Sequence, residues 1–311
     1  MLSIFKTIDG KMVQTDTIEK GAWIDLIAPT TAEIILVSES LEIERDFLSA
    51  ALDEEETSRI ETEDGVTLVI IDVPIVGNDE VNGEHAVIYS TLPLGVIITG
   101  DNIVTVCLKE VPTLTEFSSG SVRGVKTSYK TTFFFTLLLR VANRFLQYLR
   151  QIDKISNHIE RKLYQSQRNK ELIQLLDLEK SLVYFSTSLK ANETTLEKIL
   201  RGRIIKLYDE DQDLLEDVLI EVRQAIEMAN IYSTILSGTM DAFASVISNN
   251  LNVTMKMLTS LTILITIPNI IYGFYGMNVE GLPLSTSWFP LILSLGVMGV
   301  AGLILKKFKL F

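Results

Sequence analysis

Amide and hydroxyl side chains follow one face of a long apolar stretch near the end of this 311-residue chain. Alternate steps of three and four residues from Asn252 reach Met255, Thr259, Thr262, Thr266, Asn269, Gly273 and Gly276. A spacing of about 3.5 residues places these side chains on one seam of a helix that packs around a common axis. Such groups should turn away from lipid, which offers them no partner, and their oxygen atoms are the ligand type that hard divalent cations prefer.

The stretch that carries this seam has the length of a membrane span. Residues 258 to 275 contain no charged side chain, and a helix that rises about 1.5 Å per residue nearly crosses a hydrocarbon core of roughly 30 Å over that length. Two interpretations of the seam stay open. It is either a surface where helices pack through small residues and back-bonded Thr hydroxyls, or the lining of a pore built from several subunits.

The end of this span resembles the CorA family of divalent-cation channels. Tyr275-Gly276-Met277-Asn278 closes the penultimate span, and Pro268, the Met255 to Thr259 segment and the two-span ending also resemble that family. The resemblance implies a homopentamer in the cell membrane with Gly276, Met277 and Asn278 as its selectivity filter. A ring of Asn278 amides would hold Mg²⁺ through its water shell, because Mg²⁺ dehydrates reluctantly.

Residues deeper in the seam are expected to line and gate the pore. Met255 and Leu258 would form an apolar ring that closes by dewetting, as the resemblance also implies. Thr266 stands where relatives tend to carry a bulky apolar gate residue, so the middle of the pore is expected to be wetter here, with Asn269 as a further polar ring. The remaining predicted lining residues are Asn252, Thr259 and Thr262.

Carried backward at the same spacing, the seam reaches Asp241 and Asp217. In a homo-oligomer each position becomes a ring of carboxylates, which repel one another unless a cation neutralises them. Divalent ions bound between subunits would therefore hold the helices closed, and their loss would open them. The resemblance implies the same scheme with Asp217 in a regulatory metal site, and Asp79 is the partner acid that we expect from the N-terminal domain.

The predicted outer loop departs from the pattern of the family. Relatives often carry an acidic Met-Pro-Glu-Leu segment, whereas this chain reads Gly-Leu-Pro-Leu-Ser from Gly281 and keeps only Glu280. The Gly-Met-Asn sequence favours Mg²⁺, with Co²⁺ or Ni²⁺ also carried, while the altered loop keeps a Zn²⁺ transporter of the same family as an alternative. No organic cofactor is implied.

Charge is divided unevenly along the chain. Residues 251 to 311 hold four lysines and one acid, which leaves 24 basic and 39 acidic residues, a net charge of −15, for the first 250. This balance favours cations over nucleic acid as partners. The single Cys107 and a start without a long apolar core predict a cytoplasmic N-terminal part.

A second apolar stretch, Trp288 to Leu305, ends in a basic tail from Lys306 to Lys309. Because positive residues stay on the cytoplasmic side, both termini are expected inside the cell. An inside-negative potential then favours inward flow of a divalent cation by about 4.6 kcal/mol per 100 mV.

The fold class expected is an α+β membrane protein in three parts. Short β-type runs and two helices predict a cytoplasmic α/β domain over residues 1–120, with separate strands at Ala86 to Leu92 and Gly95 to Thr99. Residues 121–254 predict a cytoplasmic helical bundle and stalk, with helices at Lys130 to Tyr164, Glu171 to Leu200 and from Asp211 into the membrane. Residues 255–311 predict a transmembrane domain of two helices with a basic C-terminal tail.

Enzyme classes find little support in the sequence. It contains no glycine-rich phosphate loop, no HExxH and no CxxC, and its histidines, His85 and His158, are far apart in the chain. The alternative from another class is a membrane-anchored metal sensor or scaffold without a pore, which would have no need for Asn269 or for repeated Thr in its span.

Overall fold

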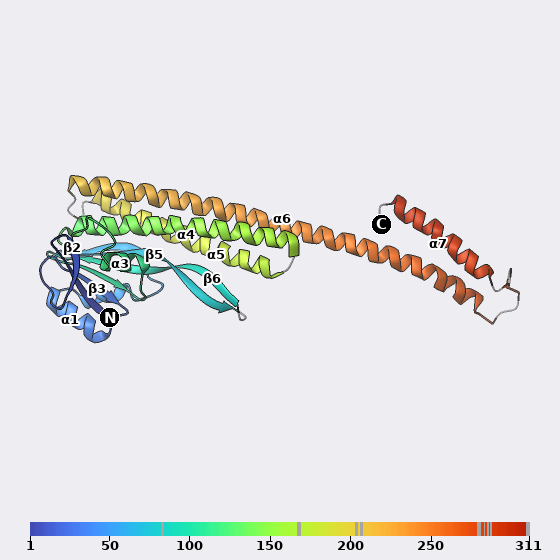
Figure 1. Ribbon diagram of the computed structural model, residues 1–311, viewed down its shortest axis with the longest axis horizontal. Helices are drawn as coiled ribbons and strands as arrows, with labels where there is room; N and C mark the ends of the chain where they lie inside the picture. The colour runs from blue at the N-terminus through green and yellow to red at the C-terminus, as the bar shows by residue number, and fades with distance from the viewer. Residues whose placement is uncertain are drawn as a thin grey trace. The chain divides into compact units, whose positions relative to one another are not determined.

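The computed structural model describes residues 1–311 apart from 82–83, 167–168, 203–204, 206–207, 279–280, 283, 285, 287 and 309–311, and it leaves out the side chains at 78–81, 84–87, 164–166, 169 and 209. The chain divides into two compact units, Met1–Thr239 and Met240–Phe311. The first unit combines a sheet with a helical bundle (Figure 1). The predicted boundaries at residues 120 and 254 stay predictions.

A seven-stranded sheet forms the base of the first unit, in the order β2-β1-β3-β7-β6-β5-β4. Its pairs are antiparallel except β3 with β7, which run parallel. The strands are β1 (Leu2–Ile8), β2 (Lys11–Thr15), β3 (Trp23–Ile27), β4 (Arg59–Glu63), β5 (Val66–Val81), β6 (Glu84–Ile98) and β7 (Ile103–Cys107).

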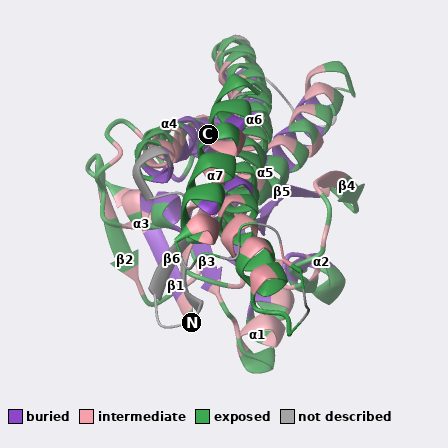
Figure 2. Ribbon diagram, turned by 90° about the vertical axis from the view of Figure 1, so that its right-hand side faces the viewer, coloured by how far each residue is buried: buried purple, intermediate pink, exposed green. Residues whose placement is uncertain are grey.

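Both faces of this sheet are covered, as the buried strands in Figure 2 show. Successive side chains of a strand point to opposite faces. Ile24 and Leu26 of β3 therefore join the core beneath α1 (Thr31–Leu41) and α2 (Arg45–Ala50). Trp23 points the other way, where its ring lies 5.2 Å from Phe133 of α4 (Lys130–Ser166) and 6.4 Å from Phe117 of α3 (Pro112–Ser118).

The first helix, α1, begins with a complete N-terminal cap. Thr30 caps α1 and Glu33 completes a capping box, because the Thr30 side chain accepts from the Glu33 amide while the Glu33 carboxylate accepts from the Thr30 amide at 2.7 Å. This exchange satisfies two backbone donors that have no partner inside the helix.

The strand boundaries differ from the prediction in the middle of the sheet. The separate strands expected at 86–92 and 95–99 are one strand, β6, which pairs with β5 continuously through Asp72 opposite Pro93. Pro93 is tolerated because the pairing of β6 with β7 stops at Leu94, so no ladder bond on that side is lost. The short β2, β4 and α3 were not predicted.

Three helices form the bundle: α4, α5 (Asn169–Gly202) and the first part of α6 (Asp209–Tyr275). Each predicted end of these helices lies within two residues of the observed end. The chain has no proline between Pro112 and Pro268, so nothing interrupts the hydrogen-bond ladder of these helices.

Asn192 joins α5 to the sheet. Its side-chain amide donates to the Asp72 carbonyl and accepts from the Asp72 amide, both at 2.9 Å, and it also accepts from the Ser58 hydroxyl. Because β4 pairs with β5 only as far as Ile70, this side chain takes the place of a strand at the edge of β5.

The second unit contains the end of α6 and α7 (Phe289–Lys307). Both helices are long and apolar enough to cross a membrane. They touch through the Tyr272 and Ser294 hydroxyls, which are 3.2 Å apart, and through the rings of Tyr275 and Phe289. An N-terminal α/β domain, a long helix and two C-terminal membrane helices are thus the architecture that the sequence predicts.

Candidate functional site

The seam predicted from the sequence is the face of α6 that the bundle leaves uncovered. Every seam residue from Asp217 to Gly238 is exposed, including the large apolar Ile220 and Ile231. The side chains on the opposite face are buried against the other helices: Leu215, Val218, Leu219, Val222, Ala225, Ile226, Ala229 and Leu236. A face that exposes isoleucines at regular spacing is typical of a helix that another chain covers.

The membrane half of α6 is covered only where it meets α7, so most of its side chains are exposed, on the seam and off it. The side that meets α7 is buried or partly buried at Ser260, Leu264, Ile267, Pro268, Ile271 and Tyr275. The seam is on the other side, and each of its residues from Asp241 to Gly276 is exposed. Contact between the two helices of this unit therefore does not account for the polar face.

Two seam hydroxyls in the membrane half of α6 bond to the helix itself, as Thr234 does in the first unit. Thr262 donates to the Leu258 carbonyl at 2.9 Å, and Thr266 donates to the Thr262 carbonyl at 2.7 Å. This back-bonding satisfies the single hydroxyl proton and leaves the oxygen lone pairs as acceptors. The seam can thus present oxygen acceptors to water or to a hydrated cation.

The predicted filter follows directly after the last turn of α6. The Gly276 amide donates to the Tyr272 carbonyl at 2.8 Å, and Met277 and Asn278 beyond it are exposed. A Cβ at residue 276 would lie only 3.0 Å from that carbonyl oxygen, so glycine fits here because of a close approach rather than a positive φ. The Asn278 side chain is free of the helix and open to solvent at this end.

The acids predicted for regulation are not brought together in one chain. Asp217 and Asp241 are both exposed on the seam, 24 residues apart on one helix. Asp79 belongs to β5 opposite Ala86, and its side chain lies outside the described residues, as does Glu280. Among the residues that the structure describes, no three His, Cys, Asp or Glu side chains gather as a metal site.

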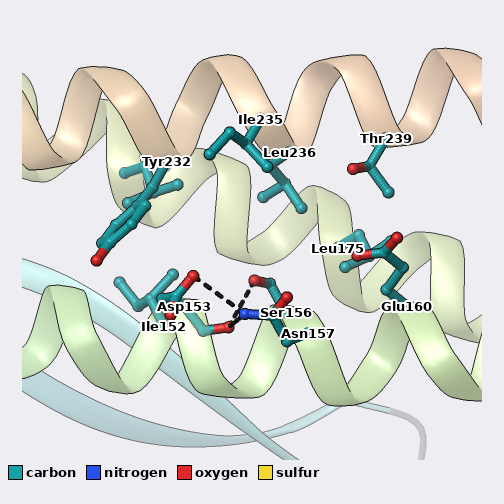
Figure 3. Close-up of a pocket in the computed structure, with 11 residues that line it drawn as sticks. Ile152, Asp153, Ser156, Asn157, Glu160, Leu175, Tyr232, Ile235, Leu236 and Thr239 are labelled. Atoms are coloured by element: carbon teal, nitrogen blue, oxygen red, sulfur yellow. Dashed lines mark hydrogen bonds between the residues drawn. The ribbon is translucent and has the colours of Figure 1, made fainter.

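A small cavity lies among α4, α5 and α6 (Figure 3). Polar side chains of α4, including Asp153 and Asn157, face Tyr232, Ile235 and other residues of α6 across it. The Asn157 amide donates to the Asp153 carboxylate at 3.1 Å. With a volume of about 20 Å³ the cavity holds one water molecule at most, so it is not a solute site.

The sequence did not predict two buried acids, Asp211 in the first turn of α6 and Asp25 in the middle of β3. The Trp23 indole donates to the Thr105 hydroxyl at 2.8 Å, and that hydroxyl donates to the Asp25 carboxylate at 2.7 Å. Burial raises the pKa of Asp25 to about 6, against the lowering effect of the Thr105 hydrogen bond. A single acid inside the apolar run Trp23–Ile27 was the available signal.

Comparison with known proteins agrees with this architecture. The family model described as CorA-like Mg²⁺ transporter protein matches residues 19–309. The chain belongs to that family. Its members are transport proteins rather than enzymes, which confirms the prediction that this chain is not an enzyme.

Two curated relatives and one solved structure show how far the similarity extends. The chain is 27% identical over 269 residues to the cobalt/magnesium transport protein CorA of Methanocaldococcus jannaschii, covering 85% of this chain and 82% of the relative. It is 33% identical over 140 residues to the protein of the same name from Thermotoga maritima, covering 41% and 39%. The complete structure of the CorA magnesium transporter from Methanocaldococcus jannaschii superposes with a TM-score of 0.79 at 24% identity, covering 99% of this chain and 96% of that one.

Proposed function

We propose that this protein is a membrane channel for Mg²⁺, and also for Co²⁺ or Ni²⁺, formed by a ring of identical chains with the α6 seam as its lining. The observation that carries the proposal is the seam itself. Its residues are exposed in both units, beside the bundle in the first unit and away from α7 in the second. A transporter with an uncovered polar face on a membrane helix has that face available to water and ions.

In this proposal, selectivity resides at the end of α6. A ring of Asn278 amides holds the cation through its water shell, supported by Gly276 and Met277. Mg²⁺ suits such a site because it keeps most of its water molecules when it binds to proteins. Met255 and Leu258 form the apolar gate, and the seam residues between them and the filter carry oxygen acceptors.

Regulation is proposed to act through the acids of the seam. Rings of Asp217 and Asp241 would bind divalent ions between subunits and hold the pore closed, with Asp79 as a further ligand from the N-terminal domain. When the internal concentration of Mg²⁺ falls, the ions leave and the carboxylates repel one another. The membrane potential of the cell then drives the cation inward without ATP, both termini being cytoplasmic.

The number of subunits and the ion order belong to the proposal as well. A pentamer in the cell membrane follows from the resemblance of the Gly-Met-Asn ending, and the acidic first 250 residues suit cations as partners. A Zn²⁺ transporter of the same family would show a proton-coupled Zn²⁺ flux. A metal-sensing scaffold without a pore would bind the ions and pass none.

The test is Mg²⁺ uptake into proteoliposomes that contain a fluorescent indicator, at a fixed inside-negative potential. Wild type is expected to conduct, and Asn278→Ala is expected to lose its preference for Mg²⁺. Asn249→Ala is the matched control, because this amide is exposed on α6 but lies off the seam. Binding of Mg²⁺ without flux in wild type would reject the pore and favour the scaffold.

A further inference from the structure

An exposed apolar row on α5 flanks α6. Leu176 and Val183 of this row stand seven residues apart on one side of the helix, and Val183 leaves 54% of its surface exposed. Val183 lies between Glu179 and Ser186 along the helix. Both of these side chains contact α6, since Ser186 donates to Asn230 at 3.0 Å and Ser237 donates to Glu179. The row therefore borders the flank of α6 that faces α5.

A second apolar surface lies across α6 from that row. Ile235, which is 59% exposed, lines the cavity together with Asp153 and Ser156 of α4 (Figure 3). It lies about 140–160° around α6 from Asn230 and Ser237, which contact α5, so it marks the flank of α6 away from α5. Ile231, which is 53% exposed, lies one turn earlier on the seam between the two flanks. The chain thus exposes one apolar row on α5 and a second apolar surface that runs from the seam at Ile231 to the opposite flank of α6 at Ile235.

The two surfaces stand at the same height along α6. The helices run antiparallel, because Ser186 is opposite Asn230 while the earlier Glu179 is opposite the later Ser237. At a rise of about 1.5 Å per residue, Val183 is level with residue 233, about 3 Å along the axis from both Ile231 and Ile235.

We propose that Val183 of one subunit packs between Ile231 and Ile235 of the next subunit, so that α5 of each chain closes against α6 of its neighbour around the ring. This inference rests on the proposed pore. In a ring of identical chains, rotation about an axis parallel to α6 does not change the position of a residue along that axis. Two surfaces that lie on opposite flanks of one chain, at the same position along the axis, therefore meet between neighbouring chains. Burial of these branched side chains supplies the favourable free energy of the contact.

Charges farther along the same two flanks are complementary. Lys190 continues the α5 row seven residues after Val183, and Glu221 is on the α4 side of α6, fourteen residues before Ile235. By the same offset Lys190 is level with residue 226, about 7.5 Å along the axis from Glu221. The long side chains of Lys190 and Glu221 can span this distance. An opposite-charge pair at the edge of an apolar contact fixes its orientation more than its strength.

The experiment uses the full-length protein in membranes and a short bis-maleimide reagent. The only native thiol, Cys107, is buried in β7. A Val183→Cys, Ile235→Cys double variant is expected to give a ladder of covalent multimers that ends at the complete ring. The matched control is Tyr184→Cys with Ile235→Cys, because Tyr184 is also 54% exposed but points about 100° away around α5. That control and each single variant are expected to stay at the wild-type background.

A seam variant separates failure of this contact from failure of the pore. If Ile231→Cys chains link to one another while the Val183 pair does not, the lateral contact is rejected and the ring remains. If neither links, the ring and the proposed function are rejected together. The contact would also be rejected if the Val183→Cys, Ile235→Cys variant and the Tyr184→Cys, Ile235→Cys control gave equal yields of covalent multimers. In a second measurement, Val183→Glu is expected to lose most of the oligomer on size-exclusion chromatography, and Tyr184→Glu is expected to keep it.

Discussion

Asp25 should make the stability of the N-terminal unit depend on pH. This carboxyl group is 4% exposed, and its pKa is raised from 3.8 to about 6, chiefly by burial. A raised pKa means that the folded protein binds the proton more tightly than the unfolded chain does. The contribution of Asp25 to stability is therefore fully present below pH 3.8 and is lost as the pH rises through 6.

The size of the effect follows from the shift in the pKa. Each pKa unit corresponds to about 1.36 kcal/mol, so the shift at Asp25 corresponds to about 3 kcal/mol, most of it between pH 4 and pH 6. For a unit of this size, that free energy changes the melting temperature by roughly 6–12 °C. Acids with a lowered pKa, such as Glu33 and Glu56, act in the opposite direction. The measurement therefore compares variants rather than wild type alone.

The assay is thermal unfolding followed by the fluorescence of Trp23 in a Trp288→Phe background, since the chain has two tryptophans. Asp25→Asn keeps an oxygen that accepts from Thr105 but carries no titrating proton. Between pH 4 and pH 7.5, the protein with Asp25 should lose roughly 2–3 kcal/mol more stability than the variant does. Asp46→Asn, at an exposed acid on α2, should keep the wild-type dependence.

Parallel pH profiles for the Asp25 protein and the Asp25→Asn variant would refute this reasoning. Such a result would mean that Asp25 titrates in the folded state as it does in the unfolded chain. The reasoning would also be refuted if the Asp25 protein gained stability relative to Asp25→Asn as the pH rises. That result would require a partner that lowers the pKa of Asp25 more than burial raises it.

Three further changes test the anchor of α5, the filter and the regulatory acid. Asn192→Ala should cost about 2–3 kcal/mol in a thermal or urea melt, because it leaves buried hydrogen-bonding groups at the edge of β5 without a partner. Gly276→Ala should impair Mg²⁺ flux in proteoliposomes, because the new methyl group meets a backbone oxygen at 3.0 Å, whereas Gly273→Ala enters open space on the same seam and should conduct. Asp217→Asn should shift the Mg²⁺ concentration that closes the channel to higher values by several-fold, and Glu216→Gln, one residue away and off the seam, should leave it unchanged in the same flux assay.

Each of these predictions has a result that would contradict it. Wild-type stability in Asn192→Ala would mean that water replaces the amide at the edge of the sheet. Equal loss of flux in both glycine variants would show that the close approach at Gly276 is not what requires glycine. Unchanged closure in Asp217→Asn would remove this acid from the regulatory site.

The pattern along α6 could be predicted from the sequence for a simple physical reason. A helix repeats its faces every 3.6 residues, so the types and spacing of Asn252, Thr259, Thr266 and their neighbours define a face without any knowledge of the partner. The absence of proline between Pro112 and Pro268 likewise predicts very long helices. The proposed filter residues come from a resemblance, since three residues alone define no site.

The sheet was harder to predict because its contacts join residues far apart in the chain. Pro93 broke the pattern of β6, and only the position where β7 stops pairing shows why a proline fits there. Asn192 reads from the sequence as an ordinary helix residue, yet it completes the edge of β5 from 120 residues away. Asp25 likewise depends on Thr105 and on burial by distant elements.

The sequence by itself determined the long helices, the two membrane spans and which face of α6 is polar, because these properties depend on local periodicity and composition. Only the tertiary structure decided that α4, α5 and α7 all leave this face uncovered. That outcome depends on where α4, α5 and α7 pack, and packing is set by the summed burial of side chains from the whole chain rather than by any one segment.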